Sequence, residues 1–196
     1  EAYAANAEAI ILDLRGNPGG NLNAVVDMCN EFLPEGLIVY TEDKHGNKKE
    51  YKSDGKHEIQ IPLVVLVDGG SASASEIMSG AIKDHGVGVL IGTKTFGKGI
   101  VQTILPLGDG SAIKITTSKY YTPSGNNIHK IGIEPDIEVP FDAEQYLNEE
   151  IDNQLEYAID YLKKELGKKI KIKTKIHILI ILFFIFNPLL FIHQIN

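Results

Sequence analysis

Short apolar runs separated by glycine-rich turns form the main pattern of this sequence. Residues 9–14, 62–67 and 87–92 are short and rich in Ile, Val and Leu, which is typical of buried strands. Apolar residues recur at helical spacing from Leu22 to Leu33, after the first run, and from Ile77 to Ile82, after the second. The pattern therefore predicts strands that alternate with helices.

A predicted hairpin and a further extended stretch interrupt this alternation. Residues 37–42 and 50–52 are extended on either side of the polar turn 44–48, which predicts an exposed β-hairpin. Residues 100–105 are rich in β-branched side chains and predict another strand. Asn21 is a suitable N-cap for the first helix.

The last part of the chain changes character twice. Residues 151–166 carry an apolar stripe at helical spacing and predict an amphipathic helix. Residues 167–196 contain five lysines and no acidic residue, and their apolar runs are short and broken. A spanning helix needs about 20 apolar residues, so a membrane-surface anchor and a non-native tail are the open interpretations. We therefore treat residues 1–166 as one domain and leave the tail without a function and its membrane association undecided.

Composition and charge exclude few functions. The chain has 196 residues, of which 43% are hydrophobic, and its net charge of −7 argues against a nucleic-acid-binding surface. The single cysteine, Cys29, falls in the first helical pattern, where core packing is favoured over reactivity. The sequence has no initiator methionine or signal peptide, and residues 1–8 already have a helical pattern, so we expect a fragment of a longer protein.

Candidate chemistry enters at the turn after the second apolar run. Gly69 and Gly70 follow the predicted strand, and the next helix opens with alternating Ser and Ala around Ser73. Backbone N–H groups and the positive end of a helix dipole point at such a turn, as in a nucleophile elbow. Ser73 followed by Glu76 also matches a capping box, so a purely structural role for this serine is the alternative.

Two further glycine-rich loops follow predicted strands. Residues 15–20 open the first helix and are a candidate anion or oxyanion site, with a simple tight turn as the alternative. Residues 92–99 nearly match a phosphate-binding loop. However, Gly99 stands where a hydroxyl should hold magnesium, and an extended stretch follows in place of a helix. A nucleotide site is therefore not expected.

The second of these loops supplies a base for the serine. Lys98 lies between two glycines and between predicted buried strands, whose apolar walls would favour the neutral amine that accepts a proton. In an extended segment Lys98 and Gln102 share a face, so the glutamine amide can orient the lysine. A Ser–Lys pair is a known variant of serine-hydrolase sites, and the alternative is a solvated surface lysine. His45 and His57 lie in charged stretches and are not expected to be catalytic.

Three ordered motifs carry a resemblance to a known family. They are Leu12-Asp13-Leu14-Arg15-x-Asn17-Pro18-Gly19-Gly20, Gly70-Ser71-Ala72-Ser73-Ala74-Ser75-Glu76 and Thr95-Phe96-Gly97-Lys98-Gly99-x-Val101-Gln102. Together with residues 120–125 and 132–136, they resemble the carboxyl-terminal processing proteases, also called tail-specific proteases. The resemblance covers about residues 9–166. It implies an α/β fold, namely a crotonase-like (Clp protease/crotonase) spiral core with β-hairpin additions.

The resemblance implies a role for each residue that aligns with the motifs. Ser73 would be the nucleophile, Lys98, 25 residues later, the general base, and Gln102 the residue that orients the lysine. The implied activity is that of a serine endopeptidase that cleaves protein substrates near their C-termini, without a metal or cofactor. The oxyanion would be held by the backbone N–H of Ala74 and by a glycine, Gly19 first, with Gly20 close behind.

The resemblance also implies features that lie outside this sequence. In the family a PDZ domain precedes the core and captures the free carboxyl end of the substrate. No such segment occurs in these 196 residues, so residues 1–166 are expected to be a catalytic core without it. The family works outside the cytoplasm, in the periplasm or cell envelope. The implied partners are polypeptide C-termini, and the oligomeric state is left open.

Two other functions are compatible with such a core. One is an inert module that binds apolar ligands or peptides, and the presence of Ser73, Lys98 and Gln102 together argues against it. The other is an acyl-CoA enzyme of the crotonase type. That function would use a glutamate as acid and base and would have no need of the lysine.

Overall fold

The computed structural model describes residues 7–167, 176–183 and 188–195. The elements in chain order are β1 (Ala9–Asp13), α1 (Leu22–Asn30), β2 (Gly36–Asp43), β3 (Lys48–Ser53), β4 (Leu63–Val67), α2 (Ala74–His85), β5 (Val89–Gly92), β6 (Ile100–Pro106), β7 (Ala112–Tyr121), β8 (Ile137–Glu138), α3 (Ala143–Glu149), α4 (Asn153–Gly167), β9 (Ile176–Phe183) and β10 (Pro188–Ile195). Apart from the inserted pair β2 and β3, strands alternate with helices from β1 to β5, so the predicted α/β class is confirmed.

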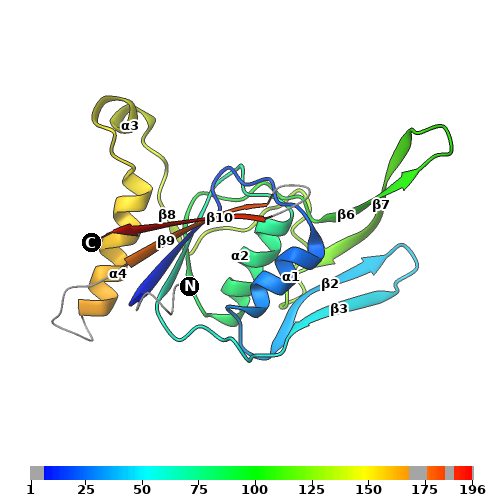
Figure 1. Ribbon diagram of the computed structural model, residues 1–196, viewed down its shortest axis with the longest axis horizontal. Helices are drawn as coiled ribbons and strands as arrows, with labels where there is room; N and C mark the ends of the chain where they lie inside the picture. The colour runs from blue at the N-terminus through cyan, green and yellow to red at the C-terminus, as the bar shows by residue number, and fades with distance from the viewer. Residues whose placement is uncertain (1–6, 168–175, 184–187, 196) are drawn as a thin grey trace.

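A six-stranded sheet in the order β10-β9-β1-β4-β5-β8 forms the centre of the fold. Its pairs are parallel, apart from β10 against β9. In Figure 1 α1 and α2 lie beside one another on one side of these strands and α4 lies on the other. Because neighbouring residues of a strand point to opposite faces, Leu12 packs with α1 and α2, whereas Ile11 packs with α4. Both faces are thus covered, which explains why these strands are almost wholly apolar.

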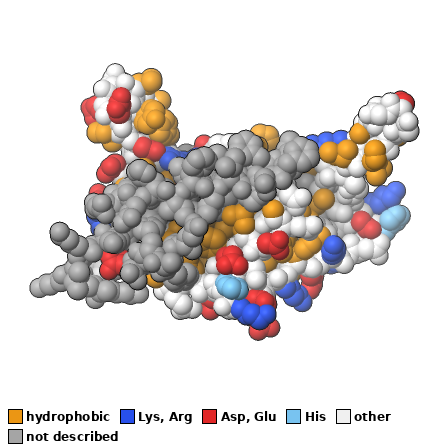
Figure 2. Space-filling view, viewed as in Figure 1, with side chains coloured by type: hydrophobic (Ala, Val, Ile, Leu, Met, Phe, Trp, Pro, Cys, Tyr) orange, Lys and Arg blue, Asp and Glu red, His pale blue; other side chains and the backbone are white. Residues whose placement is uncertain are grey.

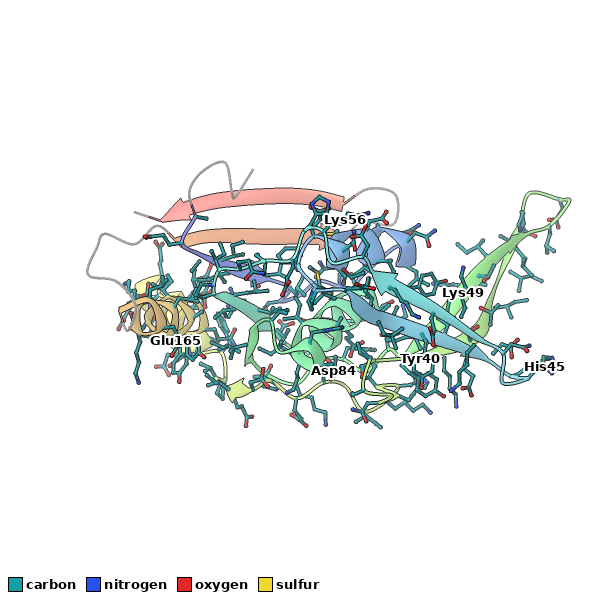
Figure 3. All side chains as sticks on the ribbon, turned by 90° about the horizontal axis from the view of Figure 1, so that it is seen from below. Tyr40, His45, Lys49, Lys56, Asp84 and Glu165 are labelled. Atoms are coloured by element: carbon teal, nitrogen blue, oxygen red, sulfur yellow. The ribbon has the colours of Figure 1, made fainter. Side chains whose placement is uncertain are left out.

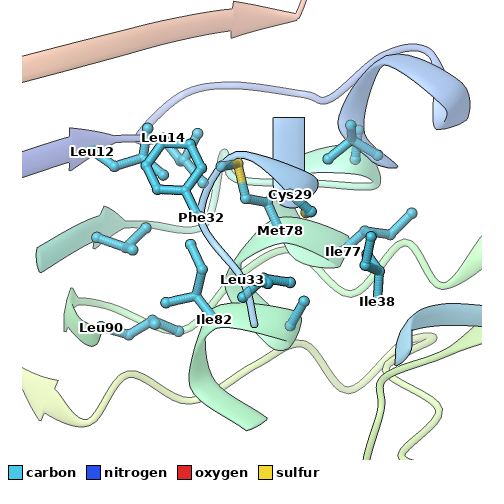
Figure 4. Packing of buried hydrophobic residues seen from close by; sticks show 14 of the residues in the cluster. Leu12, Leu14, Cys29, Phe32, Leu33, Ile38, Ile77, Met78, Ile82 and Leu90 are labelled. Carbon is cyan, nitrogen blue, oxygen red and sulfur yellow. The ribbon is translucent and has the colours of Figure 1, made fainter. Parts of the chain in front are cut away.

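The larger part of the core lies between the sheet and the helices α1 and α2. Figure 4 shows Met78 of α2 and Cys29 of α1 close together among leucine and isoleucine side chains. Cys29 is fully buried, and burial raises the pKa of its thiol. The sequence-based assignment of this cysteine to the core is confirmed.

A second sheet, in the order β3-β2-β7-β6, consists of two projecting hairpins. The predicted hairpin of β2 and β3 is present, and Figure 3 places His45 at its tip. The other hairpin, β6 with β7, exposes apolar side chains, and Figure 2 shows some of them on this projection. Those exposed to 41% or more are Ile104, Leu105, Leu107, Ile113 and Ile115.

The helix ends mostly follow the sequence. Asn21 caps α1, because its side-chain oxygen accepts the N–H of Asn23 at 2.8 Å and that of Ala24 at 3.2 Å. The predicted C-terminal helix is α4, which buries Ala158 and Leu162. Ile151 was assigned to its apolar stripe, but it precedes the helix and is 37% exposed.

The tail continues the central sheet. β9 pairs in parallel with β1, and β10 returns antiparallel along β9. Among the described residues, no helix has the length and apolar character needed to cross a bilayer. The helical pattern expected over residues 1–8 lies mainly outside the described residues.

Candidate active site

The carboxyl ends of the parallel strands bring the three predicted loops together. β1, β4 and β5 run in the same direction, so the segments that follow them emerge at one edge of the sheet. A cavity of about 260 Å³ lies there. It is lined by Gly20, Asn21, Leu22, Ser73, Ala74, Ile77, Lys98, Ile100, Val101, Gln102, Lys114 and Tyr120. Five of the six site residues predicted from the sequence line this cavity, and the sixth, Gly19, is not among its lining residues.

Ser73 occupies a strained turn between β4 and α2. Its backbone has φ 56° and ψ −112°, whereas an ordinary N-cap is extended. Such an outlier costs about 1–3 kcal/mol in a non-glycine residue and persists only where the surroundings enforce it. The capping interpretation is correct in part, since the Glu76 carboxylate accepts the N–H of Ser73 at 2.9 Å. A cap does not require the positive φ, whereas a nucleophile elbow does.

The two serines that flank Ser73 have structural roles. Ser71 Oγ donates to the carbonyl of Leu14 at 2.7 Å, and Ser75 Oγ donates to the carbonyl of Asn17 at 3.0 Å. Both are fully buried. They fasten the elbow to the loop after β1, which leaves the middle serine of the run at the cavity.

Gly19 brings the backbone of that loop against the elbow. Its φ is 84°, and a Cβ at this position would lie 2.4 Å from Ala72 O and 2.5 Å from Ala74 N. No other residue fits there without moving the turn. The Gly19 N–H donates to Asn17 Oδ1 at 3.0 Å, whereas Gly20 borders the cavity directly. The backbone of these two glycines and that of Ala74 therefore surround one corner of the cavity.

Glu76 joins the serine turn to the lysine loop. Its carboxylate is fully buried and accepts four hydrogen bonds, from Ser73 N at 2.9 Å, Thr95 Oγ1 at 2.7 Å, Gly97 N at 2.7 Å and Lys98 N at 2.8 Å. Sequence reasoning assigned Glu76 only to a cap. The sequence signal for its role in joining the two loops was its charge at the start of α2, because a buried carboxylate needs several hydrogen-bond donors.

Lys98 lies half-buried across the cavity from the elbow. Within residues 7–167 its ammonium has no hydrogen-bond or ion-pair partner. Gln102 lines the same cavity, and its Nε2 donates to Thr116 Oγ1 at 3.4 Å. Lys98 precedes β6, and a bulge lies between Val101 and Gln102, so simple strand alternation does not relate the two side chains. The orienting role of Gln102 stays a prediction.

Tyr120 is a further cavity residue whose side chain the sequence did not single out. Its hydroxyl donates to the backbone carbonyl of Ser73 at 3.1 Å, and the residue is 1% exposed. Burial and the nearby charge of Glu76 raise the pKa of Tyr120 well above its ordinary value. The phenol therefore stays protonated and supports the strained turn as a donor.

The histidines and metal-binding groups lie outside this arrangement. Neither His45 nor His57 lines the cavity, in line with the sequence analysis. In the described part of the chain, no group of three or more His, Cys, Asp or Glu side chains is placed to hold a metal ion.

Ser73, the backbone of Gly20 and Ala74, and Lys98 thus lie around one cavity, as the sequence analysis expected of a serine-peptidase site. Residues 1–139 match the family model described as Peptidase family S41. The chain therefore belongs to this family of serine peptidases, and the resemblance found in the sequence is confirmed.

Named relatives agree with this assignment. The chain is 44% identical over 158 residues to a carboxyl-terminal-processing protease of Synechocystis sp., covering 80% of this chain and 37% of that protein. It is 45% identical over 133 residues to the carboxy-terminal processing protease CtpB of Bacillus subtilis, covering 67% of this chain and 28% of that protein. The solved structure of a photosystem II D1 C-terminal processing protease superposes with a TM-score of 0.65 at 40% identity, covering 70% of this chain and 36% of that one. The chain thus spans between 28% and 37% of the length of each of these relatives.

Proposed function

We propose that this chain carries the catalytic site of a serine endopeptidase that cleaves polypeptides near their C-termini. The observation that carries the proposal is the cavity that brings Ser73, in its strained elbow, together with Lys98, whose ammonium has no partner within residues 7–167. The names of the relatives support the C-terminal preference. From the family resemblance we also propose a crotonase-like spiral core, substrate C-termini as partners and a location outside the cytoplasm.

In the proposed acylation step, Ser73 Oγ attacks the scissile carbonyl while the neutral Lys98 amine takes the serine proton. The carbonyl oxygen becomes an oxyanion, which accepts hydrogen bonds from Ala74 N–H and from the N–H of Gly19 or Gly20. Such preorganised donors are usually the largest electrostatic contribution to catalysis. Collapse of the intermediate breaks the C–N bond, and the lysine returns the proton to the leaving amine.

In the proposed deacylation step, water replaces the departed amine. Lys98 takes a proton from the water, the hydroxide attacks the acyl ester, and the proton passes to Ser73 Oγ as the new carboxylic acid leaves. Gln102 would hold the lysine amine toward the serine in both steps. The buried Glu76 keeps the two loops at a fixed separation.

Covalent labelling tests the nucleophile. A fluorophosphonate should label the wild-type chain at Ser73, and the labelling should be lost in Ser73→Ala and strongly slowed in Lys98→Ala. Ser71→Ala is the matched control, since Ser71 is buried against Leu14, and it should still be labelled. Equal labelling of Ser73→Ala and wild type would exclude this serine as the nucleophile.

Cleavage assays then separate a peptidase from an acyl-CoA enzyme. We expect hydrolysis of a fluorogenic peptide that depends on both Ser73 and Lys98. Hydrolysis of a thioester that is unaffected by Lys98→Ala, with no peptide cleavage, would instead indicate crotonase-type chemistry.

A further inference from the structure

The candidate catalytic cavity contains a second lysine that the proposed chemistry does not use. Lys98 and Lys114 both line the cavity, and none of its lining residues is acidic. The whole chain has a net charge of −7, so this cavity differs in sign from the average of the molecule. The ammonium group of Lys114, in a cavity without an acidic lining residue, attracts an anionic group, and the attraction is strongest where water is partly excluded.

The hairpin geometry fixes where Lys114 lies relative to the catalytic residues. In the β6–β7 ladder Gln102 is opposite Thr116, and Ile104 is opposite Lys114. Residues two apart on a strand share a face, and so do directly opposite residues, so Lys114 projects on the same side as Gln102. Two residues of strand correspond to about 7 Å. Lys114 therefore lies about two extended residues farther out along the hairpin than Gln102.

Lys114 is free to bind a ligand. Within residues 7–167 its ammonium has no ion-pair partner, although six other lysines in this range form ion pairs. Those six are Lys48, Lys52, Lys56, Lys83, Lys94 and Lys163. An unpaired lysine at the rim of a cavity without acidic groups is suited to a carboxylate.

We propose that Lys114 is a specificity residue that binds a carboxylate of the substrate a few residues from the bond that is cleaved. This inference rests on the proposed peptidase function. The carboxylate is either the free C-terminus of a short substrate end or an Asp or Glu side chain. Both sources present the same group, and the peptides below distinguish them. Because the ion pair is exposed, the expected preference is modest, roughly two- to five-fold, and it falls with added salt.

The test uses fluorogenic peptides that share one cleavage sequence and differ only in charge beyond it. One pair ends in a carboxylate or an amide two to four residues after the cleaved bond. A second pair is amidated and carries Asp or Asn at the same positions. We expect the wild-type chain to prefer the charged member of at least one pair through KM, with kcat little changed. Lys114→Met should abolish the preference and Lys114→Glu should reverse it.

Lys119→Met is the matched control, because Lys119 is an exposed lysine on the same strand that does not line the cavity. This variant should keep the wild-type preference. A preference in the first pair alone identifies the chain terminus as the ligand, and one in the second pair identifies an acidic side chain. If Lys114→Met retains the wild-type preference, or if neither pair shows one, the proposal is overturned.

A binding measurement separates this proposal from the peptidase proposal. Fluorescence anisotropy with Ser73→Ala reports affinity for the same peptides without turnover. Charge-dependent binding that requires Lys114, with no cleavage by wild type, would retain the carboxylate site and overturn the peptidase proposal. Cleavage without any charge preference would retain the peptidase proposal and overturn the carboxylate site. If neither cleavage nor charge-dependent binding is observed, both proposals are overturned.

Discussion

Arg15 Nη2 lies 2.8 Å from Asp152 Oδ2, so the loop that follows β1 is joined to the residue that precedes α4. Arg15 Nη1 also donates to Asp152 Oδ1 at 2.9 Å and to Gln154 Oε1 at 3.0 Å. On its other side the guanidinium pairs with Asp13 at 2.7 Å. The side chain of Arg15 is only 16% exposed. Arg15 is the first residue of the candidate oxyanion loop, so the position of this loop depends on a segment beyond the residues matched by the family model.

Asp152→Asn should therefore impair both stability and catalysis. The amide retains the size of the carboxylate but loses the charge that Arg15 faces, and the pair is intermediate between exposed and buried. We expect a loss of about 1–2 kcal/mol in the free energy of unfolding, measured by urea titration. If the pair positions the oxyanion loop, kcat should fall more than KM rises.

Asp160→Asn is the control for this variant. It makes the same change within α4, where Asp160 is 77% exposed and pairs with Lys163 at 3.6 Å. It should change stability and kcat little. Equal effects of the two substitutions would show that Arg15 and Asp152 have no special role.

The same pair predicts a dependence of stability on pH. Burial raises the pKa of Asp152, but hydrogen bonds from Arg15 and from the N–H of Leu155 outweigh it, and the pKa lies below its ordinary value. A carboxyl whose folded pKa is depressed stabilises the protein above its unfolded pKa, about 3.9, and loses this contribution as the pH falls through the folded pKa. Melting temperatures measured from pH 7 down to pH 2 should fall less steeply below pH 4 in Asp152→Asn. Identical acid slopes in the two proteins would contradict the prediction.

Glu76→Gln should separate the elbow from the lysine loop. A glutamine has one acceptor oxygen, and its NH₂ group would face donors that the carboxylate oxygens now satisfy. We expect a loss of about 2–3 kcal/mol in stability, because the lost bonds are to a buried charge. We also expect kcat to fall at least ten-fold, measured on the fluorogenic peptide. Glu50→Gln, at a side chain that is 53% exposed, is the control and should be close to wild type in both assays.

Much of the central fold could be predicted from the sequence because its determinants are local. β4 was predicted because Leu63–Val67 is an unbroken apolar run, as a strand covered on both faces must be. Asn21 was predicted to cap α1 because its side chain bonds residues only two and three positions away. In contrast, β7 was not predicted as a strand, since most of its side chains are exposed and polar residues alternate irregularly with apolar ones.

The candidate site was predictable only in part. Ser73 and Lys98 emerged from short motifs, but their approach depends on the parallel register of β4 and β5, which no local pattern specifies. The contacts of Glu76 with Thr95 and Gly97, about 20 positions away, have the same origin. The link from Arg15 to Asp152 spans 137 positions and has no sequence signal of its own.

Replacing Gly19 by alanine tests the oxyanion loop, and the same replacement at Gly16 is a matched control in the same loop. Both Gly16 and Gly19 have positive φ, 63° and 84°, so an alanine at either position strains the backbone by about 1–2 kcal/mol. At Gly16 a Cβ would meet nothing within 4 Å, whereas at Gly19 it would collide with Ala72 O and Ala74 N. Gly16→Ala should therefore lose stability alone and keep its kcat.

Gly19→Ala should lose both stability and activity, because relieving the collision must move the loop away from the elbow and so separate the candidate oxyanion donors. The measurements are the free energy of unfolding and the rate of fluorophosphonate labelling, which needs the nucleophile and the oxyanion donors but no peptide-binding contacts. Labelling of Gly19→Ala should be slowed by at least ten-fold, since removing a single oxyanion donor typically costs 10²–10³ in rate. If Gly19→Ala were labelled as fast as Gly16→Ala, the loop could move away from the elbow without slowing the reaction. The donors would then have to be sought elsewhere around the cavity.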